Sequence, residues 1–251
     1  MPEKPTISAI LIAKNERANI AQCIGALAFC DEIIVVDSGS SDGTVEIAQD
    51  LGAKVHVETD WQGFGVQKQR ALDRATGDWV LSVDADERIP SRLREEIIAA
   101  VADRRFSGYL INRLSWFLGQ PMRHGGWYPD QVLRLARREE ARFLAATVHE
   151  RLVVDGEVGS LGEPMVHYSY RSIDDVLAKL RRYALASAEA RRRAGVKGGL
   201  SSATARSLFA FTKAYFLQLG LLDGRRGFVA AVFRSQETFW RYLAAGWEKS
   251  P

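Results

Sequence analysis

The stretch WVLSVDADE at residues 79–87 joins a short apolar run to three carboxylates that follow it directly. Alternate side chains of an extended strand point to the same side, so Asp84 and Asp86 are predicted to face one way where a strand ends. Two carboxylates on one side suit a hard divalent cation that takes its other ligands from phosphate oxygens and water. The same residues also suit the cap of a helix that begins near Ser91, since acidic side chains stabilise a first turn.

The sequence before this stretch alternates strand and helix signals. Apolar, β-branched runs at 7–13 (ISAILIA), 32–36 (EIIVV) and 55–57 predict three earlier strands, and segments with helical spacing lie between them. Repeated strand–helix–strand winding predicts an α/β fold, in which a mostly parallel, Rossmann-like sheet has helices on both faces.

Three polar clusters follow the predicted strands, at the edge where such sheets bind their ligands. They are Lys14-Asn15-Glu16, Asp37-Ser38 and Asp84-Ala85-Asp86. The sequence has no Gly-x-Gly-x-x-Gly after the first strand, which argues against an NAD-type site, and it has no Walker motif. The convergence of the clusters favours a metal and a nucleotide diphosphate at this edge.

These segments together resemble the family-2 glycosyltransferases, which have the GT-A fold. The resemblance rests on ISAILIAKNE (7–16), EIIVVDSGSSDGT (32–44) and WVLSVDADE (79–87), which agree with the family's opening strand, nucleotide loop and Asp-x-Asp strand in order and spacing. More narrowly, HGGWYPDQVLRL (124–135) and the later segments TVHE, HYSY and LGLLDGRRG are similar to the branch that contains bacterial lipopolysaccharide core β-glucosyltransferases.

The resemblance implies roles for individual residues at the sheet edge. Asp37 would contact uracil or ribose, Asp84 would lie at the ribose and the metal, and Asp86 would bind Mg²⁺ or Mn²⁺ directly. The other implied nucleotide-sugar contacts are Ala13, Asn15, Glu16, Ser38 and Lys68. The residue types alone leave alternatives open, because Asp37 also suits a helix N-cap and most lysines are solvated.

The middle of the chain is predicted to hold the acceptor. A strand at 108–114 is followed by a glycine-rich loop with aromatic side chains that suit stacking on a sugar ring. Asp130 falls where the family has the aspartate that deprotonates the acceptor hydroxyl, and a carboxylate suits such a general base; it equally suits a turn after Pro129. The residues expected on the acceptor or donor-sugar side are His124, Trp127, Tyr128, His149 and Glu150.

One late histidine commonly serves the metal or the diphosphate in family 2. His149 and His167 each follow a short apolar run, and we favour His167 as the metal ligand, although a lone histidine is more often structural. Arg134 and Arg137 suit surface positions as well as diphosphate contacts.

The formal net charge of +3 conceals two parts of opposite charge. Residues 1–170 carry 19 basic and 25 acidic side chains, whereas residues 171–251 carry 15 basic and 6 acidic ones. We predict a GT-A catalytic domain over 1–170, with nucleotide-sugar binding in 1–107 and the acceptor side in 108–170. A basic, amphipathic helical extension is predicted over 171–251.

Within this extension, apolar helices are expected around 208–222 and 228–245. The apolar stretch from Ser207 to Leu222 is interrupted by Lys213 and is too short to span a bilayer. Aromatic and arginine side chains in these helices suit peripheral membrane contact. Packing of a helical hairpin on the catalytic domain or on a second subunit is an equal alternative.

Composition limits the remaining possibilities. A chain of 251 residues with 47% hydrophobic and 26% charged side chains describes a folded globular protein, and Cys23 and Cys30 match no zinc or disulfide framework. The first apolar run is too short for a signal peptide. A cytoplasmic protein is therefore predicted, in contact with the cytoplasmic face of the inner membrane if the extension binds lipid.

The sequence thus predicts a metal-dependent inverting glycosyltransferase, which moves a sugar, expected to be glucose, from a UDP-sugar to a lipopolysaccharide core or other lipid-linked glycan. A nucleotidyltransferase of similar topology is one alternative, but Lys14-Asn15-Glu16-Arg17 stands in place of its Gly-rich loop. A non-catalytic protein that binds a polyanion or a membrane is another, and it leaves the acidic sheet edge unexplained. No nucleic-acid partner is expected.

Overall fold

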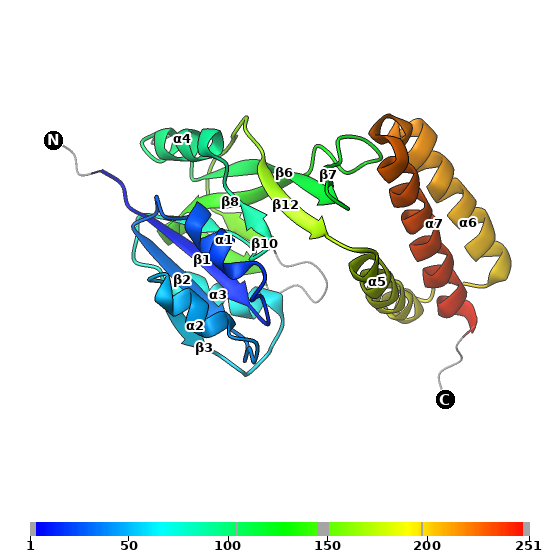
Figure 1. Cartoon of the computed structure of the whole chain (residues 1–251), viewed down its shortest axis with the longest axis horizontal. Coiled ribbons are helices and arrows are strands. Elements are labelled where there is room, and N and C mark those ends of the chain that lie inside the picture. The colour runs from blue at the N-terminus through cyan, green and yellow to red at the C-terminus, as the bar shows by residue number, and fades with distance from the viewer. Residues whose placement is uncertain (1–3, 104, 145–150, 197, 248–251) are drawn as a thin grey trace. The chain divides into compact units, whose positions relative to one another are not determined.

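The computed structural model describes residues 4–103, 105–144, 151–196 and 198–247. The first hundred residues alternate strands and helices (Figure 1): β1 (Ile7–Ala13), α1 (Ile20–Ala26), β2 (Glu32–Asp37), α2 (Thr44–Asp50), β3 (Lys54–Val57), α3 (Phe64–Asp73), β4 (Trp79–Ser82), β5 (Glu87–Arg88) and α4 (Ser91–Ala100). Strands then dominate: β6 (Gly108–Phe117), β7 (Gln120–Pro121), β8 (Gln131–Arg137), β9 (Ala141–Leu144), β10 (Arg151–Val154), β11 (Val158–Ser160) and β12 (Met165–Tyr170).

The strands form one large sheet and one small hairpin. The large sheet has the order β3-β2-β1-β4-β8-β6-β12-β5, with β7 and β11 each paired to β6, and β9 and β10 make the hairpin. β1 runs parallel to β2 and β4, and β2 runs parallel to β3, whereas β8 is antiparallel to both β4 and β6. The predicted α/β fold is confirmed.

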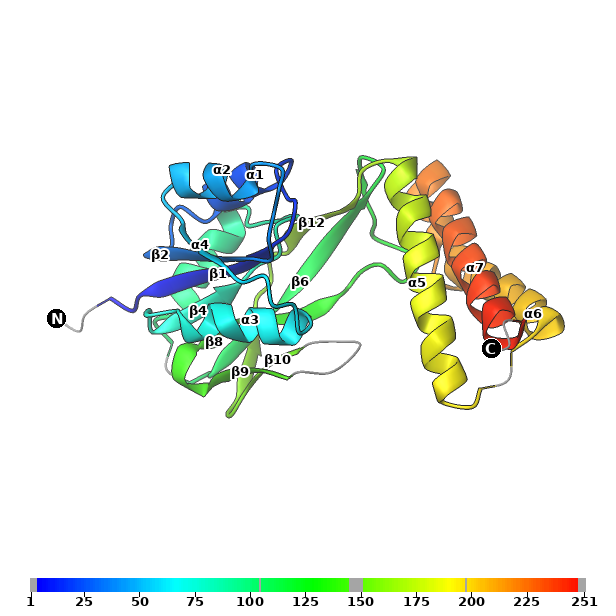
Figure 2. The same cartoon turned by 90° about the horizontal axis from the view of Figure 1, so that it is seen from below.

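Helices cover both faces of this sheet because successive side chains of β1 point to opposite sides. Leu11 belongs to the same buried cluster as Ile24 of α1 and Ile97 of α4, whereas Ile10 belongs to a cluster with Leu72 of α3. Figure 2 shows α1 and α2 on one side of β1 and α3 on the other. Full burial of each such side chain contributes about 1.5–3 kcal/mol, so the two apolar layers hold the strand ends in place.

The chain divides into two compact units. The first, here called the sheet unit, contains Met1–Arg113 and Asp130–His167, and the second, the helical unit, contains Leu114–Pro129 and Tyr168–Pro251. The division of the chain into domains at residues 170 and 171 stays a prediction.

The helical unit is built from α5 (Ile173–Arg193), α6 (Leu200–Thr212) and α7 (Gly224–Trp247), and α7 packs against both other helices. α5 begins with a capping box, in which the Asp175 amide donates to Ser172 Oγ and the Ser172 amide donates to the Asp175 carboxylate. A buried aromatic cluster that includes Phe117, Tyr170 and Phe233 joins the segment 114–129 to these helices.

The helix expected around 208–222 is interrupted. α6 ends at Thr212 and is followed by a π-helical turn over Lys213–Leu217 and a 3₁₀ turn over Gly220–Asp223. A Cβ at Gly220 would lie only 2.6 Å from the carbonyl oxygen of Ala214, so the chain folds back on itself too tightly for a regular helix. Among the residues that the structure describes, no helix combines the length and the apolarity needed to cross a bilayer.

Glu32, at the start of β2, connects three segments of the sheet unit. Its Oε1 accepts hydrogen bonds from Ser8 Oγ (2.6 Å) and from the amide and hydroxyl of Thr76 (2.6 and 2.8 Å), and its Oε2 lies 2.6 Å from Lys54 Nζ. Burial works to raise the pKa of Glu32, but these hydrogen bonds lower it to about 2.

We expect Glu32→Gln to lower the free energy of unfolding at pH 7 by on the order of 1–3 kcal/mol. Because the folded-state pKa of Glu32 lies below its unfolded-state value of about 4.3, its contribution is complete above that value and is lost as the pH falls toward 2. Urea unfolding from about pH 7 down to pH 3 measures both effects. Glu95→Gln, at an exposed position of α4, is the matched control, and equal stabilities of the two variants would contradict this account.

Candidate active site

The loop after β1 is hydrogen-bonded to the loop after β2. The Asn15 amide donates to Ser40 Oγ (2.8 Å), and Asn15 Oδ1 accepts from the Ser41 amide (2.9 Å). The amide of Glu16 donates to Thr44 Oγ1 (2.8 Å). Asn15 has a φ of 56°, a left-handed conformation that asparagine tolerates better than most residues. Two of the three predicted polar clusters are therefore held side by side.

Asp37 is buried and organises its own loop. Its Oδ1 accepts hydrogen bonds from the amides of Gly39 (2.9 Å) and Ser40 (2.7 Å), and Ser40 Oγ donates to Oδ2. Gly43 occupies the N-cap position of α2, so Asp37 does not cap that helix as one interpretation of the sequence expected. Its contact with a nucleotide stays a prediction.

Ala13 and Ser38 lie between this loop and α3. The Ser38 amide donates to the carbonyl oxygen of Ala13 (2.9 Å), and Ser38 Oγ accepts from Gln67 Nε2 (2.9 Å). Both residues are buried, and α3 also carries Lys68. Through Gln67 and Lys68, α3 therefore links the loop after β2 to Asp84, which follows β4.

Six charged side chains of alternating sign form a connected row in the sheet unit, which we call the charge ladder. In order, they are Lys68, Asp84, Arg134, Glu87, Arg113 and Asp130. Lys68 Nζ lies 2.9 Å from Asp84 Oδ1. One terminal nitrogen of Arg134 lies 2.6 Å from both Asp84 Oδ2 and Glu87 Oε1. Arg113 lies 3.8 Å from Glu87 and 2.7 Å from Asp130, which completes the row.

The middle of the charge ladder is removed from solvent. The Glu87 side chain is 0% exposed and that of Arg134 is 7% exposed. Burial raises the pKa of Glu87. Burial also works to raise the pKa of Asp84, but Arg134 and Lys68 hold that pKa well below its usual range. Asp84 is therefore ionised at neutral pH and fixed by a cation at each oxygen.

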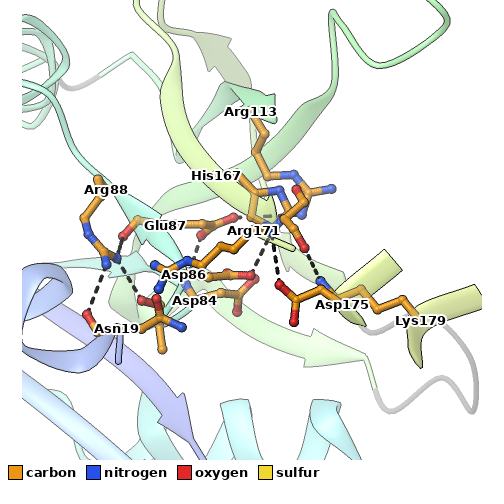
Figure 3. Close-up of polar contacts among 12 residues, drawn as sticks. Asn19, Asp84, Asp86, Glu87, Arg88, Arg113, His167, Arg171, Asp175 and Lys179 are labelled. Atoms are coloured by element: carbon orange, nitrogen blue, oxygen red, sulfur yellow. Dashed lines mark hydrogen bonds and ion pairs between the residues drawn. The ribbon is translucent and has the colours of Figure 1, made fainter. Parts of the chain in front are cut away.

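Asp86 and His167 face each other beside the charge ladder (Figure 3). His167 Nε2 lies 3.4 Å from Asp86 Oδ2, and their side chains are 18% and 26% exposed. The backbone of His167 pairs with Glu87 across the antiparallel β12–β5 contact, which places the imidazole next to the carboxylates. Glu87 also accepts the Asp84 amide at Oε2 (2.9 Å). Backbone pairing and a buried carboxylate thus fix the relative positions of Asp84, Asp86 and His167.

The Asp86–His167 pair fits a divalent cation. Adjacent ligands of an octahedral ion with bonds of about 2.1 Å are separated by about 3 Å, close to the observed spacing, and a carboxylate with an imidazole is a suitable donor pair for Mn²⁺. Both oxygens of Asp84 already contact cationic side chains. In the part of the chain that the structure describes, no three His, Cys, Asp or Glu side chains are grouped to hold a metal ion.

Asp130 is held by one arginine. The Nε and a terminal nitrogen of Arg113 lie 2.9 and 2.7 Å from Asp130 Oδ2, and the Arg113 amide donates to the Asp130 carbonyl oxygen (2.8 Å). The other carboxylate oxygen, Oδ1, takes no part in this pair and belongs to a side chain that is 39% exposed. Arg113 therefore fixes the orientation of the Asp130 carboxylate through Oδ2.

The remaining predicted site residues belong to the helical unit or are not described. His124 Nδ1 lies 2.9 Å from Asp223 Oδ1, and the backbone amide of His124 donates to Oδ2 of the same buried carboxylate (2.9 Å). Trp127 is half-buried and packs against Phe117, with ring centroids 5.6 Å apart, and Tyr128 is also half-buried. His149 and Glu150 lie outside the described residues.

Sequence reasoning missed the ladder residues Arg134, Glu87 and Arg113, and the partner of His124. Arg134 is a buried ion-pair partner. The sequence feature that could have predicted this is a charged residue at an inward position of an apolar strand (VLRLA). Arg137 instead lies over the Trp79 ring at 4.7 Å. Pro90 occupies the N-cap position of α4, so the carboxylates after β4 do not serve as that helix cap.

A sheet covered by helices on both faces, with the Asp84–Asp86 carboxylates at its carboxyl edge, is the arrangement expected of a transferase with the GT-A fold. The chain belongs to glycosyl transferase family 2, whose family model matches residues 8–150.

Relatives support this membership along most of the chain. The sequence is 31% identical over 246 residues to the lipopolysaccharide core biosynthesis glycosyltransferase LpsC of Rhizobium meliloti, a match that covers 92% of this chain and 88% of LpsC. It is 32% identical over 251 residues to an uncharacterized glycosyltransferase of Rickettsia felis, covering 94% and 87%. The solved structure of Staphylococcus aureus TarS 1–349 shares the fold, with a TM-score of 0.50, 16% identity and coverage of 96% and 90%. The predicted glycosyltransferase class is confirmed.

We expect Arg134→Met to lower the free energy of unfolding by about 3–5 kcal/mol, because it leaves two carboxylates beside each other with one of them buried. Urea unfolding followed by circular dichroism measures the loss. Adding Glu87→Gln to this variant is expected to restore part of the lost free energy of unfolding, since the uncompensated buried charge is removed. Arg92→Met, at a position 82% exposed, is the matched control, and a loss no larger than that of the control would argue against the buried network.

Proposed function

We propose that the protein is a metal-dependent inverting glycosyltransferase, which moves a sugar, glucose in our proposal, from a UDP-sugar to a lipopolysaccharide core or other lipid-linked glycan. The observation that carries the proposal is the Asp86–His167 pair next to an ionised Asp84, at the edge where the loops after β1 and β2 are bonded together. The similarity to LpsC supports the choice of acceptor. The proposal retains the cytoplasmic location expected from the sequence.

On the donor side, the chain would bind the nucleotide and the cation. Asp86 and His167 would hold Mg²⁺ or Mn²⁺, which when bound offsets the negative charge of the leaving diphosphate. Asp84, fixed by Lys68 and Arg134, would lie beside the ribose. The loop residues proposed to surround the nucleotide are Ala13, Asn15, Glu16, Asp37 and Ser38.

On the acceptor side, Asp130 would act as the general base. Its Oδ1 would take the proton of the acceptor hydroxyl as the new bond to the anomeric carbon forms and the bond from that carbon to the diphosphate oxygen breaks. Attack from the face opposite the leaving group inverts the configuration in one displacement. Arg113, which holds Oδ2, is a positioning residue that aims Oδ1.

Five further residues are proposed to surround the sugars, namely His124, Trp127, Tyr128, His149 and Glu150. Of these, His124 has the clearest geometry. The Nδ1 atom lies 2.9 Å from the buried Asp223 carboxylate, so Nε2 is the ring nitrogen outside this contact. A ring held in this way suits a hydrogen bond between Nε2 and a sugar hydroxyl.

We expect Asp130→Asn to lower kcat by about 10²–10⁴-fold while UDP affinity in the presence of Mn²⁺ changes less than about twofold, since an amide accepts no proton at neutral pH. A radiolabelled transfer assay with the purified lipid acceptor and calorimetry with UDP measure the two quantities. Asp50→Asn, at an exposed position of α2, is the control and should transfer normally. Near-normal transfer by Asp130→Asn would exclude Asp130 as the base.

We expect His167→Ala and Asp86→Ala each to weaken Mn²⁺-dependent UDP binding by about tenfold or more, because each removes a ligand of the same ion. The comparison is calorimetry with UDP, with Mn²⁺ and with EDTA in its place. His56→Ala, in β3, is the histidine control. If His149→Ala weakens the Mn²⁺-dependent binding and His167→Ala does not, the ligand assignment is wrong.

A further inference from the structure

One end of the helical unit carries an apolar surface, which we call the apolar tip. It lies where α6 ends and α7 begins (Figure 1). Its exposed members are Leu208, Phe209, Phe216, Leu217, Leu219, Leu221, Leu222 and Phe228. Leu217 is 68% exposed and Leu208 is 64% exposed, so large apolar side chains are in contact with water. Large exposed apolar side chains gathered in neighbouring segments are typical of a contact site.

The apolar tip is an ordered structure. Phe211 lies 5.8 Å from Phe228 and 6.3 Å from Phe216, between ring centroids, and Tyr215 lies 5.6 Å from Phe228. Hydrogen bonds from the Leu219 amide to the Phe216 carbonyl oxygen (3.2 Å), and from the Leu222 amide to that of Leu219 (2.9 Å), close its two turns. These bonds satisfy backbone groups inside the turns, and the leucine side chains of the turns are 41–68% exposed.

The charges around the apolar tip have one sign. Lys213, Arg225 and Arg226 are exposed in its turns and at the start of α7. The sequence between Arg193 and Glu237 contains a single acidic residue, Asp223. This carboxylate is buried, and it is hydrogen-bonded to His124. The tip therefore presents apolar side chains and positive charge together.

We propose that the apolar tip docks on an anionic lipid bilayer, with its leucine and phenylalanine side chains in the outer part of the acyl region and its basic side chains at the lipid phosphates. Anionic headgroups complement Lys213 and Arg225, and each cation near such a surface strengthens binding. Arg226 adds positive charge nearby, but its guanidinium donates hydrogen bonds to the Leu118 carbonyl oxygen and to Gln120. A symmetric contact with a second copy fits less well, because it would bring Lys213, Arg225 and Arg226 near their own copies.

Lipid binding by the apolar tip depends on the surface chemistry of the helical unit and not on the identity of the sugar donor. It deepens the proposed function in one respect, since an enzyme held on a bilayer meets a lipid-linked acceptor by diffusion in two dimensions. Vesicle binding is measured without sugar nucleotide or acceptor. A protein that does not bind vesicles is therefore distinguishable from one that does not transfer the sugar.

The test is flotation of the full-length protein with vesicles of phosphatidylcholine alone, or with about one-third phosphatidylglycerol. We expect binding to the anionic vesicles that falls as salt is raised. Leu217→Glu/Leu222→Glu and Lys213→Gln/Arg225→Gln should each weaken it by about tenfold or more. Leu51→Glu, at an exposed position after α2, is the matched control and should bind like the wild type. Circular dichroism and the thermal midpoint show whether each variant is folded.

Three results would overturn the proposal. The first is a wild-type protein that does not float with anionic vesicles. The second is a folded Leu217→Glu/Leu222→Glu variant that binds as tightly as the wild type. The third is a wild-type dimer in sedimentation that this variant converts to a monomer while vesicle binding is unchanged, which would identify the apolar tip as a subunit contact.

Discussion

The contact on which the site depends is that of Arg134 with two carboxylates, since one guanidinium nitrogen lies 2.6 Å from both Asp84 and Glu87. A buried charge is stable only when it is paired, so Glu87 requires Arg134, and both require the surrounding strands in register. Glu87 in turn accepts the Asp84 amide, and its backbone pairs with that of His167. The positions of the candidate metal ligands are therefore consequences of one ion-pair network in the sheet unit.

Much of the fold could be predicted from local sequence. The runs ISAILIA and EIIVV are apolar on both faces, and a strand covered by helices on both sides buries most of such a run, as β1 and β2 show. Because parallel strands end at the same edge, the polar residues that follow each run were expected together, and the bonds from Asn15 to Ser40 and Ser41 agree with this. Here the local pattern and the tertiary structure impose the same arrangement.

The partners within the charge ladder could not be predicted, because they are separated by many residues and depend on strand order. Arg134 reaches Asp84 because β8 lies beside β4, an antiparallel neighbour that no local pattern specifies. The same limit applies after α6, where a π-helical turn and a close approach of Gly220 to the Ala214 carbonyl oxygen replace the regular helix that the residue types favour. Residue composition describes which side chains are present, whereas topology decides which of them meet.

The chain passes between its two units three times, at residues 113–114, 129–130 and 167–168. β6 and β12 each begin in the sheet unit and end in the helical unit, so at two of these three crossings the polypeptide changes unit within a strand. The helical unit is therefore not a removable tail. An exchange of this unit between family members, by recombination or by design, would have to carry residues 114–129 and the C-terminal helices together, with the second junction next to Asp130. The helical unit can therefore be exchanged only as two segments, residues 114–129 and the C-terminal helices, which must be inherited together.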